Sequence, residues 1–358
     1  MYEAFGNYNA IVHPELRGVN PILNEIQIIK NYPDYNDVLG SLNKGASIHK
    51  EVRRFLQPHL KPGIKLVDIA KLIEMKTIEL SNQTKSINKG IGFPVGLALN
   101  NCAAHYHPTS TDNTVFSKDD IIKIDYGTEV NGFIVDSAFT VCFNDKFDPL
   151  MQAVREATET GITNAGIDVD IGDWAISIQE VMESHEIVLD GKTYPIKAIS
   201  NLGGHNITRG IIHGGTFLPC VSMKHKLPPN YRFKEGVYAI ETFGSTGTSE
   251  TVSQDNLCTL YRLNQDKLNQ MNTIKLDSTK KLCQRIKGTF DTLPFCDRYV
   301  ELFNVNNFKS HLNILTNSNF INAYPPLYTN EGSYTAQYEH TIYLNESGKY
   351  VVSRGEDY

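Results

Sequence analysis

The chain has 358 residues, of which 41% are hydrophobic and 21% are charged, so it can bury a large core and allows about one to three domains. The net charge of −6 and the pI near 6.0 argue against a protein that binds nucleic acid or an anionic membrane. The sequence opens without a basic stretch and apolar run, and no apolar run approaches the roughly 18 residues of a membrane span. We therefore expect a cytoplasmic protein.

The predicted elements follow the order helix, helix, strand, and this order occurs twice. In the first half, helical periodicity is followed by strand patterns and a hairpin, over Asp34 to Gln57, Leu66 to Leu80, Phe93 to Leu99 and 122–141. In the second half, Pro149 to Asn164 and Ile171 to Glu183 have helical patterns and precede strands that carry His205, Glu241 and Glu339. The pattern predicts an α+β fold with an internal pseudo-two-fold repeat.

One segment breaks the repeat, because far more residues separate Glu241 from Glu339 than a strand connection needs. Helical patterns cover Leu257 to Asn264, Ser278 to Lys287 and Arg298 to Phe303. We therefore predict a catalytic domain formed by residues 1–251 and 316–358, with an inserted helical subdomain at 252–315.

The two aspartates of the predicted hairpin are expected to lie close together. Asp125 and Asp136 lie in β-branched runs on either side of a segment that contains Asn131-Gly132, a hairpin signal. Folding back about Val130-Asn131 is expected to bring the two aspartates opposite each other. Two buried carboxylates side by side are costly unless a cation or a proton lies between them. A metal ion would resolve this conflict.

Three further residues extend this pattern across the chain. Glu241 and Glu339 lie inside apolar strand patterns, and His205 lies in a glycine-rich segment that also contains His213. Four carboxylates and one imidazole at strand positions are the usual ligand set of a two-metal hydrolytic site, because oxygen-rich bridging ligands hold hard or borderline divalent cations together.

Five motifs resemble those of the eukaryotic type 2 methionine aminopeptidases, in the same order along the chain. The resemblance runs from about residue 10 to the last residue, and the motifs are NNCAAHY at 100–106, KIDYG at 123–127, NLGGH at 201–205, AIETFGSTG at 239–247 and AQYEHTI at 336–342. It implies the pita-bread fold and the co-translational removal of the N-terminal methionine from nascent proteins, with a preference for a small second residue. The chain resembles a short form without the N-terminal extension of many relatives, which is typical of a reduced-genome eukaryote such as a microsporidian.

The resemblance also implies roles for the five candidate ligands, Asp125, Asp136, His205, Glu241 and Glu339. Asp136 and Glu339 would bridge two divalent ions, Asp125 would complete one coordination sphere, and His205 and Glu241 would complete the other. Glu241 would also carry a proton during the reaction. The ligand set fits manganese, iron, cobalt or zinc and does not choose among them.

Two histidines and an apolar pocket would act on the substrate, again by resemblance. His213 would polarise the scissile carbonyl, and His105 would hydrogen-bond near the leaving nitrogen and react with epoxide inhibitors of the family. Phe93, Ile212 and Tyr324 would line the methionine pocket together with the two histidines. The chain departs from the animal enzymes at Leu260, which replaces a pocket histidine.

Other side chains near these motifs receive structural interpretations. We expect His107 to be exposed and His340 to face away from the site, since neighbours on a strand point to opposite faces. The six cysteines show no metal-binding spacing and are expected to be free thiols, although Cys102 stands close to His105.

Two alternative functions remain open at this point. One is a proline-specific aminopeptidase or dipeptidase with the same fold and ligand set, and the other is a catalytically silent pita-bread binding protein. The expected partner is the N-terminal methionine of nascent polypeptides, with ribosome contact through the catalytic core. We expect a monomer that binds neither nucleic acid nor membrane.

Overall fold

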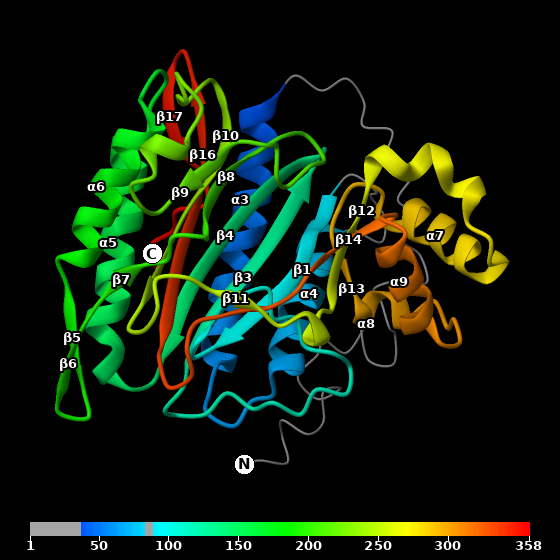
Figure 1. Ribbon diagram of the computed structural model, residues 1–358, viewed down its shortest axis with the longest axis horizontal. Coiled ribbons are helices and arrows are strands. Elements are labelled where there is room, and N and C mark those ends of the chain that lie inside the picture. The colour runs from blue at the N-terminus through cyan, green and yellow to red at the C-terminus, as the bar shows by residue number, and fades with distance from the viewer. Residues whose placement is uncertain (1–36, 83–88) are drawn as a thin grey trace.

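Two antiparallel sheets and their covering helices form the centre of the molecule, as the computed structural model shows (Figure 1). The structure describes residues 37–82 and 89–358. The predicted start of the first helix at Asp34 and the first 36 residues of the predicted catalytic domain lie outside the described residues. Among the described residues, no helix has the length and apolar character needed to cross a bilayer.

The first half forms a three-stranded sheet with the order β1-β3-β4, covered by two helices. The helices are α3 (Val38–Leu56) and α4 (Leu66–Ser81), and the strands are β1 (Lys89–Leu99), β3 (Ile121–Val130) and β4 (Phe133–Cys142). Both helices pack an apolar face against the strands, with Val52, Leu56, Ile69 and Ile73 buried beside Ile122 and Ile124. The predicted helices, strand and hairpin are confirmed.

The hairpin between β3 and β4 turns at Asn131 and Gly132, whose φ angles of 55° and 86° suit the left-handed turn that the sequence pattern indicates. The register corrects one prediction, because Asp125 pairs with Ala138 and Asp136 pairs with Gly127. The two aspartates are diagonal neighbours on one face of the sheet and are not directly opposite. They still lie close enough to interact.

The second half forms a six-stranded sheet on the path β17-β16-β10-β8-β9, with β7 paired to β10. Helices α5 (Asp148–Asn164) and α6 (Ile171–Glu183) cover its outer side (Figure 1). The strands are β7 (Lys197–Ala198), β8 (Gly203–Ile207), β9 (Phe217–Pro219), β10 (Gly236–Ser245), β16 (Thr335–Asn345) and β17 (Gly348–Val351). A hairpin of β5 (Glu186–Leu189) and β6 (Lys192–Pro195) follows α6.

Much of the segment predicted as an insert, residues 252–315, lies at one edge of the molecule (Figure 1). Its helices are α7 (Asp277–Phe290), α8 (Asp297–Glu301) and α9 (Phe308–Asn317), together with the 3-10 segments η5 (Asp255–Leu257) and η6 (Gln265–Thr273). They pack on a small sheet of β13 (Phe295–Cys296), β12 (Leu260–Leu263) and β14 (Ile321–Tyr324). Another three-stranded sheet joins β11 (Val252–Ser253), β15 (Leu327–Tyr328) and β2 (Cys102–Ala104).

The predicted helix at Leu257 to Asn264 is wrong, because half of this segment is strand β12, which lies between β13 and β14. Cross-strand packing of Leu260, Tyr261 and Leu263 outweighs the local helical pattern, as tertiary contacts commonly do for short apolar segments. The helices predicted near Ser278 and Arg298 are confirmed. The boundaries of the inserted subdomain stay a prediction.

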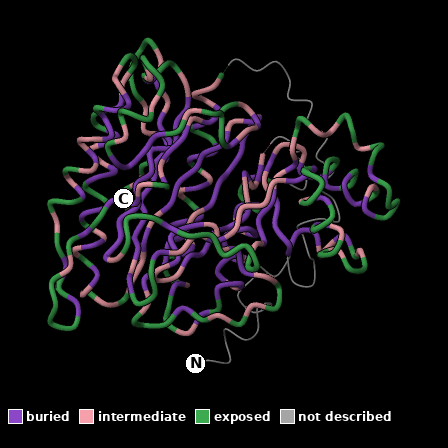
Figure 2. The backbone as a smooth tube through the Cα atoms, in the orientation of Figure 1, coloured by how far each residue is buried: buried purple, intermediate pink, exposed green. Residues whose placement is uncertain are grey.

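Buried residues gather on the central strands, and exposed residues are frequent at the periphery of the molecule (Figure 2). A polar side chain on these strands is therefore removed from water and must find a partner.

Candidate metal centre

The five predicted ligands lie on five strands that converge on one pocket of about 370 Å³. The first half contributes Asp125 from β3 and Asp136 from β4, and the second half contributes His205 from β8, Glu241 from β10 and Glu339 from β16. All five side chains line this pocket. The structure therefore brings together every residue of the predicted ligand set.

Strand register places like charges against each other. Glu241 of β10 pairs directly with Glu339 of β16. Ala239, two positions before Glu241, pairs with His205 of β8. Opposed acidic side chains destabilise a sheet, and here Glu241 and Glu339 are also only 8% and 1% exposed. Such a pair needs a positive partner between the carboxylates.

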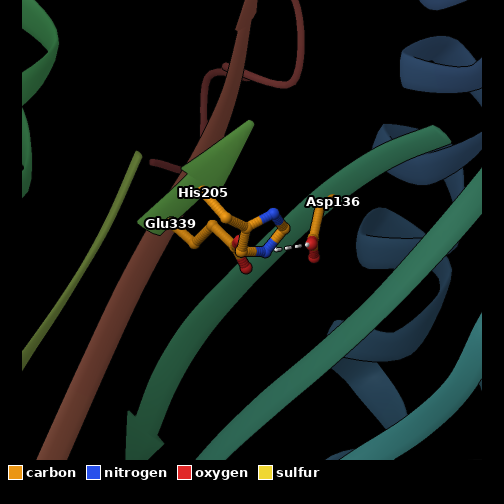
Figure 3. A group of neighbouring side chains, drawn as sticks. All are labelled: Asp136, His205 and Glu339. Carbon is orange, nitrogen blue, oxygen red and sulfur yellow. Dashed lines mark ion pairs between the residues drawn. The ribbon is translucent and has the colours of Figure 1, made fainter. Parts of the chain in front are cut away.

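Three of the predicted ligands form a tight group between the two halves. Donor atoms of Asp136, His205 and Glu339 all lie within 4.8 Å of one another, and the three side chains point toward one another in Figure 3. His205 Nε2 is 3.5 Å from Asp136 Oδ2 and 3.8 Å from Glu241 Oε1. The other ring nitrogen, Nδ1, is 3.4 Å from the Asn206 carbonyl oxygen. This backbone contact leaves Nε2 to face the acids, as in a metal-ligating histidine.

The electrostatics of the group fit divalent cations. Burial raises the pKa of Asp125, Glu241 and Glu339 well above the ordinary range, and the neighbouring carboxylates raise each pKa further. Asp125 Oδ1 and Glu339 Oε2 are buried without a hydrogen-bond partner within the described part of the chain. Buried polar atoms normally have partners, and oxygen and imidazole donors in this arrangement suit a hard or borderline cation.

Two histidines lie beside this group. The His213 ring stands perpendicular to the His205 ring at a centroid distance of 4.3 Å, and burial and the nearby His205 lower the pKa of His213. His105 has a φ of 64°, which is unusual for a residue with a side chain, and its ring lies 6.1 Å from that of Tyr324. Burial lowers the pKa of His105 to about 4. Both imidazoles are therefore neutral near pH 7, and His105 occupies a strained backbone conformation of the kind found at functional sites.

The remaining wall of the pocket is apolar. The predicted residues Phe93, Ile212 and Tyr324 line it, and Leu260 of the insert does so as well. Leu260 pairs with Tyr324 across β12 and β14. The insert thus contributes one side of the cavity.

Two pocket residues were not predicted as functional. His107 was expected to be exposed, and this is wrong, because it is buried, lines the pocket and contacts the His105 carbonyl oxygen through Nδ1 at 3.1 Å. The loop folds inward because Thr259 Oγ1 of the insert donates to the His107 carbonyl, a contact without a local sequence signal. Gln337 donates from Nε2 to Glu241 Oε2 at 3.0 Å. Its place two residues before Glu339, on the same strand face, was the available signal.

Other sequence expectations concern residues near the pocket. His340 faces away from the centre and contacts Ser353 Oγ through Nδ1 at 2.9 Å, as expected. The six cysteines are free thiols. Burial raises the pKa of Cys102 to about 11, which keeps its thiol protonated and excludes a thiolate nucleophile.

The chain matches known proteins over most of its length. Residues 40–250 match the model of metallopeptidase family M24. Methionine aminopeptidase 2 of Komagataella phaffii is 46% identical over 325 residues, which cover 90% of this chain and 71% of that protein. The Dictyostelium discoideum protein of the same name is 44% identical over 325 residues, with the same two shares of 90% and 71%.

Solved structures share the fold at low sequence identity. A thermophilic Arx1 has a TM-score of 0.73 at 18% identity and covers 90% of this chain and 92% of its own. Methionine aminopeptidase from Thermotoga maritima has a TM-score of 0.56 at 17% identity, with coverage of 90% and 98%. These likenesses confirm the predicted α+β pita-bread fold. The chain belongs to metallopeptidase family M24 and, within it, to the type 2 methionine aminopeptidases.

Proposed function

We propose that this chain is a metallo-aminopeptidase that hydrolyses the bond after the N-terminal methionine of a polypeptide. The observation that carries the proposal is the convergence of Asp125, the three buried acids Asp136, Glu241 and Glu339, and His205 on one pocket whose far wall is apolar. An apolar pocket beside a hydrolytic centre suits an unbranched thioether side chain. The identity with methionine aminopeptidase 2 proteins supports the same substrate.

The five acidic and imidazole side chains would hold two divalent cations, manganese, iron, cobalt or zinc. When bound, such ions supply a water-derived nucleophile at neutral pH and polarise the scissile carbonyl. By the family resemblance, Asp136 and Glu339 would be shared by both ions, and the close grouping of Asp136, His205 and Glu339 is compatible with this. Asp125 would belong to one set of ligands, and His205 and Glu241 would belong to the other.

Glu241 is the proposed proton-transfer residue. Its carboxylate is buried, and Gln337 occupies Oε2, so Oε1 faces the centre near His205 Nε2. A carboxylate held this way can take a proton from the nucleophile and return it to the leaving amine.

The two neutral histidines contact the substrate. His213 donates a hydrogen bond to the carbonyl oxygen as negative charge develops there, and one such donor typically contributes about 10² to 10³ in rate. His105 hydrogen-bonds near the leaving nitrogen, and His107 holds its backbone. Phe93, Ile212 and Tyr324 surround the methionine side chain, and the family resemblance implies a preference for a small second residue.

Because the His105 imidazole is neutral, we also propose His105 as the nucleophile that attacks an epoxide. The epoxide ring opens as an N–C bond forms and a C–O bond breaks. Intact-mass measurement would detect the adduct in the wild-type protein, and the His105→Asn variant should remain unmodified. We further propose that the protein acts as a monomer on nascent chains in the cytoplasm, with ribosome contact through its catalytic core.

A peptide panel tests the proposed reaction. The chelated protein, and the protein resupplied with each divalent metal, would be given peptides beginning Met-Ala, Met-Gly, Met-Val, Met-Leu and Ala-Pro. We expect metal-dependent release of free methionine, fastest before a small residue. Cleavage only before proline would assign the chain to a proline-specific activity, and the absence of hydrolysis with every metal would favour a silent binding protein.

A further inference from the structure

The two proposed shared ligands lie on strands of different sheets, so no backbone ladder fixes their spacing. Asp136 is on β4 of the first sheet, and Glu339 is on β16 of the second. Three buried hydroxyl side chains join these strands instead, and we call Ser137, Thr140 and Thr341 the hydroxyl seam.

Each member of the hydroxyl seam bonds the backbone of the facing strand. Ser137 Oγ donates to the Glu339 carbonyl oxygen at 2.8 Å, and Thr140 Oγ1 donates to the Gln337 carbonyl oxygen at 2.7 Å. Thr341 Oγ1 accepts from the Asp136 amide at 2.7 Å and donates to the Asp136 carbonyl oxygen at 2.6 Å. The backbone of both shared ligands is therefore held by side chains.

Tyr358 completes this arrangement from the face opposite the pocket. Its hydroxyl oxygen is 2.6 Å from Ser137 Oγ. A serine hydroxyl carries one hydrogen, and Ser137 uses it on the Glu339 carbonyl, so Tyr358 is the donor in this contact. The Tyr358 ring stacks on His340 at a centroid distance of 4.7 Å. Tyr358 thus contacts residues that directly follow Asp136 and Glu339.

Arg53 of α3 fixes the segment that carries Tyr358. Its guanidinium carbon lies 4.4 Å from the centre of the Tyr358 ring, and its Nε and Nη2 donate to Asp357 Oδ2 and Oδ1 at 2.7 and 2.8 Å. The Arg53 side chain is only 1% exposed. Its Nη1 lies 3.1 Å from His49 Nδ1, and His49 Nε2 lies 3.0 Å from the Tyr126 carbonyl oxygen. Since an arginine can only donate, His49 accepts at Nδ1 and donates from Nε2, so the same group reaches the residue after Asp125.

We propose that Tyr358 is a positioning residue of the metal centre, which acts through Ser137 on the backbone of Glu339 and is held in place by Arg53. This inference rests on the proposed function, since it concerns the same metal ligands. Outer groups that orient ligands commonly change metal affinity by about 10-fold to 100-fold when removed. Tyr358 would thereby maintain the spacing between the shared ligands of the two half-sites.

The test compares two tyrosine-to-phenylalanine variants that keep the ring and remove one buried hydroxyl. Tyr358→Phe loses the contact with Ser137, and Tyr238→Phe is the matched control, because its hydroxyl contacts only Lys234 backbone atoms among the hydrogen bonds of the described residues. Binding of Mn²⁺ and Co²⁺ to the chelated proteins would be measured by calorimetry. We expect about 10-fold to 100-fold weaker binding in Tyr358→Phe and less than about a 2-fold change in the control. Equal affinities in both variants would overturn the proposal.

A second variant tests the route through Ser137. Ser137→Ala should weaken metal binding, and the double variant Ser137→Ala/Tyr358→Phe should bind no more weakly than Ser137→Ala alone, because the two hydroxyls act in series. Additive losses would overturn the proposed route. If Ser137→Ala does not fold, the comparison of Tyr358→Phe with Tyr238→Phe still decides. Since metal binding is the readout, a wild-type protein that binds metal without releasing methionine would refute the proposed function and leave this test intact.

Discussion

At the scale of single residues, charge and burial define the centre. The acids Asp125, Asp136, Glu241 and Glu339 line one pocket and repel one another unless protons or cations intervene. His105 and His213 have a different role, because burial keeps both rings neutral and available as hydrogen-bond partners. Acids inside apolar strand patterns indicated the candidate ligands from the sequence, and the family resemblance supplied their proposed roles.

His213→Asn should separate catalysis from metal binding. The His213 ring lies beside His205 but outside the compact group of Asp136, His205 and Glu339. We expect kcat to fall about 10²-fold to 10³-fold, because a donor to the developing oxyanion is lost, while the metal Kd changes little. Steady-state kinetics and metal titration on the same preparation would check this. A large loss of metal affinity would instead make His213 a ligand.

At the scale of elements, the insert is held against the catalytic core by a buried ion pair. Arg298 of α8 donates from Nη1 and Nη2 to Glu74 of α4 at 2.7 and 2.5 Å, and Tyr299 donates to the same carboxylate at 2.8 Å. Arg298 Nε also donates to the Pro108 carbonyl oxygen at 2.8 Å. This contact lies just beyond His105 and His107, so the docking of the insert supports the histidine loop.

Arg298→Ala should therefore affect stability and substrate binding together. Removal of one partner leaves the Glu74 charge buried, and breaking such a pair typically costs about 3–5 kcal/mol. We expect a loss of this size in the free energy of unfolding and a raised KM for Met-Ala peptides. A double Glu74→Met/Arg298→Met variant should regain part of the stability, because no buried charge remains. Denaturant unfolding and peptide kinetics give both quantities, and an unchanged KM in a folded Arg298→Ala protein would disprove the link to the histidine loop.

Some elements could be predicted from local sequence and others could not. The helices and the hairpin follow from local periodicity and from the turn residues Asn131 and Gly132, so they could be predicted. Strand β12 and the inward position of His107 could not, because both depend on partners far along the chain, β14 and Thr259. The predicted partner of Asp125 was wrong by two positions, because Asp125 pairs with Ala138 and not with Asp136. The pairing depends on which two residues form the turn.

At the scale of the whole molecule, the two halves meet at the acidic pocket. The free energy of unfolding should therefore depend on metal and on pH. In the metal-free protein, the pKa values of Asp125, Glu241 and Glu339 are raised above their unfolded values of about 4. The folded state then binds more protons than the unfolded state, so these groups favour folding below pH about 4, and this contribution is lost as the pH rises through the raised values. Bound metal reverses the effect by neutralising the carboxylates.

Glu339→Gln isolates this contribution from the buried histidines, whose lowered pKa values act in the opposite direction. Without metal, the unfolding free energy of the wild-type protein minus that of Glu339→Gln should fall as the pH rises from 5 to about 7.5. With metal, the wild-type protein should gain about 2.7 kcal/mol at a metal concentration of roughly 100 times Kd. Chemical denaturation across this pH range gives both values, and a difference that rises with pH in the metal-free state would contradict the assignment of Glu339.

Five side chains from the two halves are proposed to hold two divalent ions that drive methionine release. The most direct measurement counts bound metal by elemental analysis and measures methionine release from Met-Ala-Ser in the same samples of wild-type, Asp136→Asn and Tyr238→Phe protein. We expect two ions per chain and full activity in the wild-type and Tyr238→Phe proteins, with loss of both metal and activity in Asp136→Asn. Full activity in metal-depleted protein, or in folded Asp136→Asn, would contradict the account.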